Sequence, residues 1–351
     1  MSPMHICGLL LTATVMTQAI PAFGQADPNA AQAREEKLIA VLKSDAPHKE
    51  KADACRSLAV IGTKACVPAL AGLLADEHLS HMARYALEPI TDASVDECLR
   101  DALGTLKGRQ LVGVIGSIGV RRDAKAVDAL AELLTKGRPG PVQAAARALG
   151  CIGNETAVKA LQGAVEKAPP VRQLAICEGL LRCAERLAAD NRGDAAVAIY
   201  DQLRGMNRVA HQVRTAAVRG AILTRRQAGA ALLKEYLANS DFTLFSAACR
   251  ASREMPGTET TSALASALAN LPADNQILVM QTLGLRADPT AVPALANAAK
   301  SGDKAVRLVA IRSLAKVGHA SAAPVLEALT TDSDADLSKA AKESLASLPK
   351  P

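Results

Sequence analysis

Large aromatic side chains are nearly missing from this 351-residue chain, which has no Trp, three Tyr and three Phe. A large globular core usually includes aromatic anchors, so the core here must be built from Ala, Val, Leu and Ile. Small side chains of this kind favour helices that approach one another closely. Outside the N-terminus no apolar run approaches the roughly 20 residues that span a bilayer, so no membrane span is predicted.

Sequence motifs of catalytic and cofactor sites are also missing. The chain has no Gly-x-Ser-x-Gly, Walker loop, HExxH, zinc-type cysteine cluster or CxxC. His78 and His81 are spaced i, i+3, but no third metal ligand is evident. We therefore predict no enzyme activity, no cofactor and no metal. The net charge of +6 is mild for this length and, with so few aromatics for base stacking, does not indicate nucleic-acid binding.

The N-terminal segment has the pattern of a secretory signal peptide. Residues 6–19 are mostly apolar, and "AFG" at 22–24 offers small residues at both positions of a cleavage site. The segment departs from the usual pattern because it has no Lys or Arg before the apolar run. The alternative, a buried first helix, is disfavoured because no amphipathic face is present. We expect a signal peptide over residues 1–24 and export to the periplasm or the exterior.

Eight cysteines are present, and seven remain if the signal peptide is removed. An odd number cannot all pair within one chain. Most of them occupy positions where related segments carry Ala, Val or Leu, which predicts small buried hydrophobic residues. One or two disulfides remain open, because the spacing does not specify a pairing.

A helix-sized pattern recurs ten times, mostly at intervals near 31 residues, as in "PVQAAARALGCIG" (141–153) and "VRLVAIRSLAKVG" (306–318). A second pattern lies between the copies, as in "PTAVPALANAAKS" (289–301). Both place apolar residues at i, i+3, i+4 and i+7, the stripe of an amphipathic helix. The expected stops of the first helix are Gly62, Gly119, Gly153 and Gly318, and the expected first-turn prolines of the second are Pro68, Pro293 and Pro324.

These segments resemble the HEAT-repeat family, in its short bacterial form found in phycobilisome lyases. The resemblance covers residues 36–349 and implies an all-α fold, a right-handed α-solenoid of about ten stacked helical hairpins. Residues 25–49 are expected to form a capping helix and linker, with a lone outer helix over 34–45, and residues 50–351 the repeat array. In some exported bacterial proteins with similar segments, the array precedes a sugar-cleaving or haem-carrying domain. The chain ends within its tenth unit, so none is expected here.

Two units depart from the even spacing. The unit near 171–212 carries about eleven extra residues, and its "AVAIYDQL" piece resembles a tetratricopeptide helix. The alternative is a bend in the superhelix. The third unit has three extra residues after Gly119, which predicts a longer turn displaying Arg121 and Arg122. Two arginines on a turn can bind an anion, although an ordinary solvated turn is the simpler interpretation.

The seventh position of the first helix in each unit is often arginine, and we call these residues the arginine row. Its members are Arg56, Arg84, Arg147, Arg219, Arg250 and Arg312. At 100° per residue the position lies away from the core, so a cationic row along the concave wall is predicted, suited to an acidic protein surface. Alternatively the arginine stems merely cover neighbouring alanines and local carboxylates neutralise them.

The function that these patterns favour is an exported, non-enzymatic scaffold that binds another macromolecule, most simply a protein, through its concave face. Partner binding is assigned to the arginine row together with Arg121 and Arg122. The alternative is an accessory subunit of an extracytoplasmic carbohydrate-degrading or redox enzyme. A nucleic-acid-binding HEAT-like protein is less favoured.

Overall fold

Residues 28–349 are described by the computed structural model, so the predicted signal peptide lies outside the described part of the chain. The described residues form twenty α-helices, connected by turns and short 3-10 segments, and contain no strand. The all-α solenoid predicted from the repeats is confirmed. The lone outer helix predicted over 34–45 is the C-terminal part of α1, which packs on α2 and α3.

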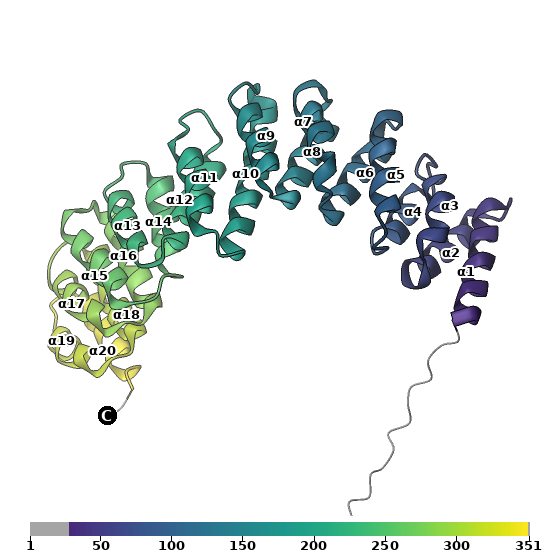
Figure 1. Cartoon of the computed structure of the whole chain (residues 1–351). Coiled ribbons are helices and arrows are strands. Elements are labelled where there is room, and N and C mark those ends of the chain that lie inside the picture. Colours follow the sequence, from purple (N-terminus) through teal and green to yellow (C-terminus); the bar gives the residue numbers. More distant parts are fainter. Residues whose placement is uncertain (1–27, 350–351) are drawn as a thin grey trace, which may run out of the picture.

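The helices alternate between two layers of an arc, in which the even-numbered helices line the concave side and the odd-numbered helices the convex side (Figure 1). The inner helices are α2 (His48–Ile61), α4 (Ser80–Leu87), α6 (Gly108–Arg121), α8 (Pro139–Ile152), α10 (Pro170–Ala189), α12 (His211–Thr224), α14 (Phe242–Ser252), α16 (Ala273–Arg286), α18 (Lys304–Val317) and α20 (Ala335–Ala346). The outer helices are α1 (Pro28–Lys43), α3 (Val67–Ala71), α5 (Ala93–Thr105), α7 (Val127–Lys136), α9 (Glu155–Val165), α11 (Gly193–Gly205), α13 (Gly229–Leu237), α15 (Thr258–Ala267), α17 (Val292–Lys300) and α19 (Ala323–Leu329).

Small side chains set the spacing between neighbouring inner helices. The core is mostly Ala, Leu, Val and Ile, and consecutive inner helices such as α6, α8 and α10 pack directly on one another. A methyl group on Gly119 of α6 would lie 2.9 Å from the Cα of Ala148 on α8, closer than side chains tolerate. Close approach of backbones therefore replaces the aromatic anchors that the sequence lacks.

The predicted helix ends are partly confirmed. Gly153 and Gly318 follow α8 and α18 in the left-handed conformation, at φ 63° and 67°, which glycine adopts without a steric penalty. Gly62 follows α2 but is extended rather than left-handed. The three prolines expected in the first turn of an outer helix lie in α3, α17 and α19, where a missing backbone N–H breaks no helical bond.

The predicted stop at Gly119 is wrong, and so is the longer turn inferred from it. Helix α6 continues through Gly119 to Arg121, and Arg122 is its left-handed cap, at φ 57°. Counted from this cap, eight residues lead to Leu130 of the next helix, as eight lead from Gly153 to Leu161. The three-residue surplus disappears because a non-glycine residue occupies the cap.

The longer fifth unit has its extra residues in its helices. Helix α10 has 20 residues, against 14 in α6, α8, α12, α16 and α18. The turn to α11 is short and includes Asn191 at φ 60°. Tyr200 of α11 is buried against Gly220 of α12, where a methyl group would lie 2.3 Å from the ring.

Candidate functional site

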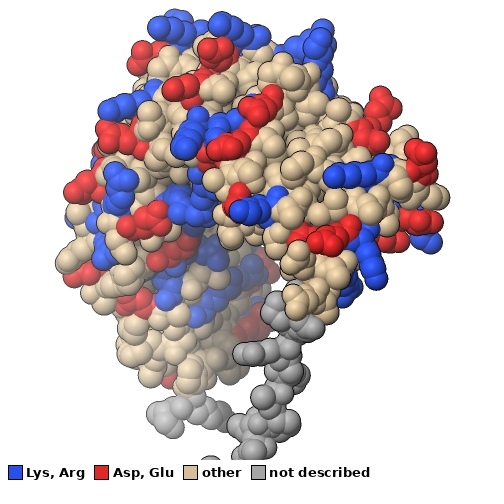
Figure 2. Space-filling model, turned by 45° about the vertical axis from the view of Figure 1, so that its right-hand side comes forward, with Lys and Arg blue, Asp and Glu red and all other residues tan. Residues whose placement is uncertain are grey.

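The arginine row lies on six inner helices, as its spacing predicts. Arg56 is on α2, Arg84 on α4, Arg147 on α8, Arg219 on α12, Arg250 on α14 and Arg312 on α18. Five of the six are exposed, whereas Arg84 is only partly exposed. Figure 2 shows Lys and Arg side chains gathered in the hollow of the arc, with some Asp and Glu among them.

Arg84 differs from the rest of the row because it packs across the next inner helix. Its guanidinium occupies the space beside Gly113, where a methyl group would lie 2.5 Å from Cζ, and its Nη1 donates to the Gly113 carbonyl at 3.3 Å. Burial lowers the pKa of Arg84, and the nearby Glu88 carboxylate acts in the opposite direction. Gly113 therefore makes room for an arginine rather than for a neighbouring backbone, and the expectation of full exposure is wrong for Arg84.

Only part of the arginine row is neutralised by carboxylates. Arg56 pairs with Asp53 of its own helix, and Arg219 pairs with Glu254. Within residues 28–349, the side chains of Arg147, Arg250 and Arg312 make no hydrogen bond or ion pair. The row is therefore neither fully cationic nor fully neutralised by local carboxylates, since three of its members keep free guanidinium groups.

Arg121 is not displayed on a turn, so that expectation is wrong. Its side chain is 9% exposed, and it donates to both oxygens of Asp96, with Nε–Oδ1 at 2.5 Å and Nη2–Oδ2 at 3.0 Å. It also donates to the carbonyls of Glu88, Ile90 and Asp92. Arg121 thus fixes the end of α6 to the turn between α4 and α5. The neighbouring Arg122 is exposed, as predicted.

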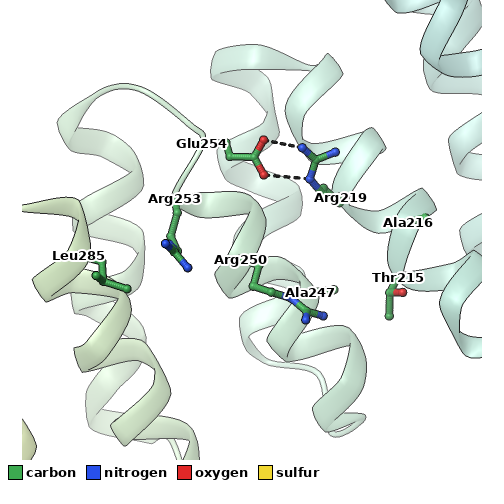
Figure 3. Close-up of a pocket in the computed structure, with 8 residues that line it drawn as sticks. All are labelled: Thr215, Ala216, Arg219, Ala247, Arg250, Arg253, Glu254 and Leu285. Atoms are coloured by element: carbon green, nitrogen blue, oxygen red, sulfur yellow. Dashed lines mark hydrogen bonds and ion pairs between the residues drawn. The ribbon is translucent and has the colours of Figure 1, made fainter.

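A cationic hollow of the concave face lies between α12, α14 and α16, and we call it the α12–α16 hollow (Figure 3). Its volume is about 610 Å³, and its lining is Thr215, Ala216, Arg219, Ala247, Arg250, Arg253, Glu254 and Leu285. Arg253 follows α14 directly, and its side chain, like that of Arg250, makes no hydrogen bond or ion pair within the described residues. The hollow therefore carries three arginines against one carboxylate.

One ion pair crosses the α12–α16 hollow. Arg219 donates to both Glu254 oxygens, with Nε–Oε1 at 2.9 Å and Nη2–Oε2 at 2.5 Å (Figure 3). This fork geometry is the strong form of an arginine–carboxylate contact. Hydrogen bonding to Arg219 lowers the pKa of Glu254, and the same bonds raise the pKa of Arg219. Both side chains remain about half exposed, so water and other carboxylates have access to them.

A second hollow, of about 530 Å³, lies between α4, α6 and α8. Arg84, Arg147 and Gly116 of α6 line it. Gly116 holds the position of the arginine row, because it precedes the cap Arg122 by six residues, as Arg147 precedes the cap Gly153. A methyl group on Gly116 would meet no atom within 4 Å. The missing side chain therefore opens this part of the concave face.

Exposed large hydrophobic side chains also lie on the inner helices, and the sequence analysis missed them. In the described chain they are Val60, Tyr85, Val120, Val171, Phe242 and Leu285, on α2, α4, α6, α10, α14 and α16. Val60 is four residues after Arg56, and Val120 and Leu285 are four residues after the corresponding positions of α6 and α16. An apolar residue at this spacing, beside the row, is the signal that could have found these three.

The buried cysteines do not supply a reactive thiol. The seven cysteines of the described residues are free, and five of them are buried. Burial raises the pKa of Cys55 to about 11 and of Cys183 and Cys249 to about 12. Only the thiolate is a nucleophile, so these groups are unreactive near neutral pH. They act as the small hydrophobic residues that the sequence predicted.

Metal-binding clusters and membrane-spanning helices are both absent from residues 28–349. No cluster of three or more His, Cys, Asp or Glu side chains within them is arranged to hold a metal ion. The His78 ring instead packs at a tilt against the His48 ring, with the centroids 4.7 Å apart. No helix in the same range has the length and hydropathy to cross a membrane.

Comparison with known proteins agrees with this architecture. Residues 106–180 and 261–346 match a family model described as HEAT repeats, whereas no curated protein matches the sequence. A structure of Kap95p binding RanGDP aligns with a TM-score of 0.55 and 11% identity, over 90% of this chain and 50% of the other. Human deoxyhypusine hydroxylase aligns at 17% identity over 92% of this chain and 99% of its own, with a TM-score of 0.33.

The complex of CpcE and CpcF of phycocyanin lyase from Nostoc sp. aligns at 20% identity over 79% of this chain and 96% of the other, also with a TM-score of 0.33. At these identities the likeness concerns the fold alone, and the chain spans about half the length of the Kap95p structure. The repeat pattern, the layered helices and the family match agree. Residues 106–180 and 261–346 match HEAT repeats, and the described chain as a whole is an α-solenoid.

Proposed function

We propose that this chain is a scaffold that binds another protein through its concave face and has no catalytic activity of its own. Stacked helical repeats create an extended concave surface, and such surfaces serve many α-solenoids in binding. One observation carries the proposal. The large hydrophobic side chains exposed in the described chain all lie on inner helices, the layer that also carries the arginine row.

This combination favours a protein partner over other ligands. Exposed hydrophobic residues beside charged ones are typical of protein-binding surfaces. Leu285 and Val120 line the two concave hollows, so apolar contacts and guanidinium groups are available in the same places. An acidic protein surface fits best, because three members of the row have no carboxylate partner within residues 28–349.

Export is part of the proposal and rests on the sequence of residues 1–24. It is tested by fractionating the native cells and determining the N-terminus of the protein recovered outside the cytoplasm. A mature chain that begins near residue 25 supports export. A cytoplasmic chain that retains Met1 contradicts it.

The binding function is tested by affinity capture from an extract of the native cells, followed by identification of the retained proteins. The informative variant reverses the three partnerless arginines of the row, as Arg147→Glu, Arg250→Glu and Arg312→Glu. It should lose a partner that the unmodified chain retains, since like charges repel an acidic surface.

A matched control places the same charge reversal on the outer layer, as Lys125→Glu, Lys234→Glu and Lys300→Glu. These lysines are exposed in or directly before outer helices, so capture should be unchanged. Equal loss in both variants would indicate a general charge effect, and unchanged capture by the inner variant would refute binding through the arginine row.

A further inference from the structure

The α12–α16 hollow combines available cations with an apolar surface. Arg250 and Arg253 are three residues apart, at the end of α14, and both line the hollow. Neither side chain makes a hydrogen bond or ion pair within the described residues. Leu285 of α16 is 53% exposed and lies across from Arg253 (Figure 3).

The Arg219–Glu254 pair shows what kind of group the hollow accepts. The Glu254 carboxylate accepts two parallel hydrogen bonds from Arg219, a geometry that suits any planar carboxylate. The pair is half exposed, so a second carboxylate can approach the neighbouring Arg250 and Arg253 from the solvent. Glu254 is thus an internal example of the chemistry that an external ligand would use.

We propose that the α12–α16 hollow binds an acidic segment of a partner protein in which carboxylate side chains are interspersed with aliphatic ones. The carboxylates pair with Arg250 and Arg253, and an aliphatic side chain covers Leu285. This inference rests on the proposed protein-binding function and names the site and the chemistry of the partner. Phosphate backbones fit less well, because they make no use of Leu285 and the lining has no aromatic ring for bases.

Glu254 also limits the affinity of this site. Its carboxylate pairs with Arg219, so the Arg219 guanidinium is not available to a ligand, and it lowers the net positive charge of the hollow by one. Glu254→Gln frees the Arg219 fork and removes a charge that repels the ligand. We expect this substitution to strengthen binding several-fold, a gain that a purely structural role of Glu254 would not produce.

The test uses labelled synthetic peptides and fluorescence anisotropy with the full chain. One peptide alternates Glu and Leu, a second replaces every Leu with Ser, and a third replaces every Glu with Lys. The Glu–Leu peptide should bind best, more weakly at high salt, and the Lys peptide should not bind. The double variant Arg250→Gln, Arg253→Gln should weaken binding by about tenfold, since each exposed charge pair contributes a modest amount.

Two further variants separate charge from apolar contact. Leu285→Ser should weaken binding of the Glu–Leu peptide a few-fold and leave the Ser-containing peptide unaffected. Arg208→Gln is the matched control, because Arg208 is exposed in the loop between α11 and α12 and does not line the hollow. It should leave binding unchanged.

Several outcomes overturn the inference. They are equal binding of a single-stranded oligonucleotide and the Glu–Leu peptide, an unchanged affinity in the double variant, and a Glu254→Gln variant that binds no better than the unmodified chain. These failures differ from failure of the proposed function. If the row variant loses its captured partner while the Arg250, Arg253 double variant retains it, the scaffold function stands and the site lies elsewhere on the concave face.

Discussion

Arg121 provides the sharpest test of how neighbouring repeats are held together. Its guanidinium is buried between Asp96 and the carbonyls that end α4, and Arg121→Met removes the guanidinium while keeping most of the apolar stem. The substitution leaves three carbonyls and a partly exposed carboxylate without their donor. Breaking a fully buried ion pair costs roughly 3–5 kcal/mol. Because Asp96 is 26% exposed and can be rehydrated, we expect about 3 kcal/mol.

The neighbouring residue supplies a matched control. Arg122 is exposed and has no hydrogen bond or ion pair from its side chain within the described residues, so Arg122→Met should change the free energy of unfolding by less than about 0.5 kcal/mol. Two adjacent arginines in the same sequence context are therefore expected to differ several-fold in their effect. Sequence spacing alone predicts equal effects, because it placed both on one exposed turn.

The assay is urea denaturation followed by circular dichroism, with native-state hydrogen exchange to locate the change. Solenoid stability is approximately a sum of repeat and nearest-neighbour interface terms, so exchange should rise in α4, α5 and α6 and stay unchanged in α16 to α20. A double-mutant cycle with Asp96→Asn measures the coupling directly. Equal stability of the two Arg→Met variants would refute the assigned role of Arg121.

Three further predictions concern glycine, cysteine and pH. Gly116→Ala should stabilise the chain by about 1 kcal/mol, because no atom opposes the added methyl group. Gly119→Ala should destabilise the chain by about 1–3 kcal/mol, because α8 must move away from the added methyl group. Thermal denaturation of both variants measures these changes, and a Gly119→Ala variant as stable as the unmodified chain would contradict the close approach of α6 and α8. Cys183 and Cys249, with pKa values near 12, should resist alkylation by iodoacetamide in the native chain at pH 8 and should react in urea. Mass spectrometry measures the alkylation, and rapid reaction of the native chain would refute their burial. The pKa of Glu254 is lowered in the folded state, so its contribution to stability is present above its unfolded pKa and is lost as the pH falls through the folded value. The difference in unfolding free energy between the unmodified chain and Glu254→Gln should therefore shrink on acidification. A difference that grows would be inconsistent with the ion pair.

The repeat and its helices could be predicted from the sequence because each unit carries the apolar spacing of an amphipathic helix. Ten copies of the same stripe leave no other way to bury the apolar faces than stacking. The row position of Arg147, Arg250 and Arg312 followed from the same period, since exposure depends only on the angle around a helix.

The positions of Gly119 and Arg121 could not be predicted in the same way. A glycine at the expected place suggested a helix stop, but only the contact with Ala148 on the next helix shows why glycine is needed there. The acceptors of Arg121 lie 25 to 33 residues away along the chain, so nothing in its own unit indicates burial. Contacts between repeats, rather than patterns within them, decide these positions.

The central claim is that a protein partner occupies the concave face. Hydrogen–deuterium exchange of the chain, alone and with the partner recovered by capture, tests it most directly. Protection concentrated in the even-numbered helices, strongest in α12, α14 and α16, is the predicted result. Protection confined to the odd-numbered outer helices would contradict the account.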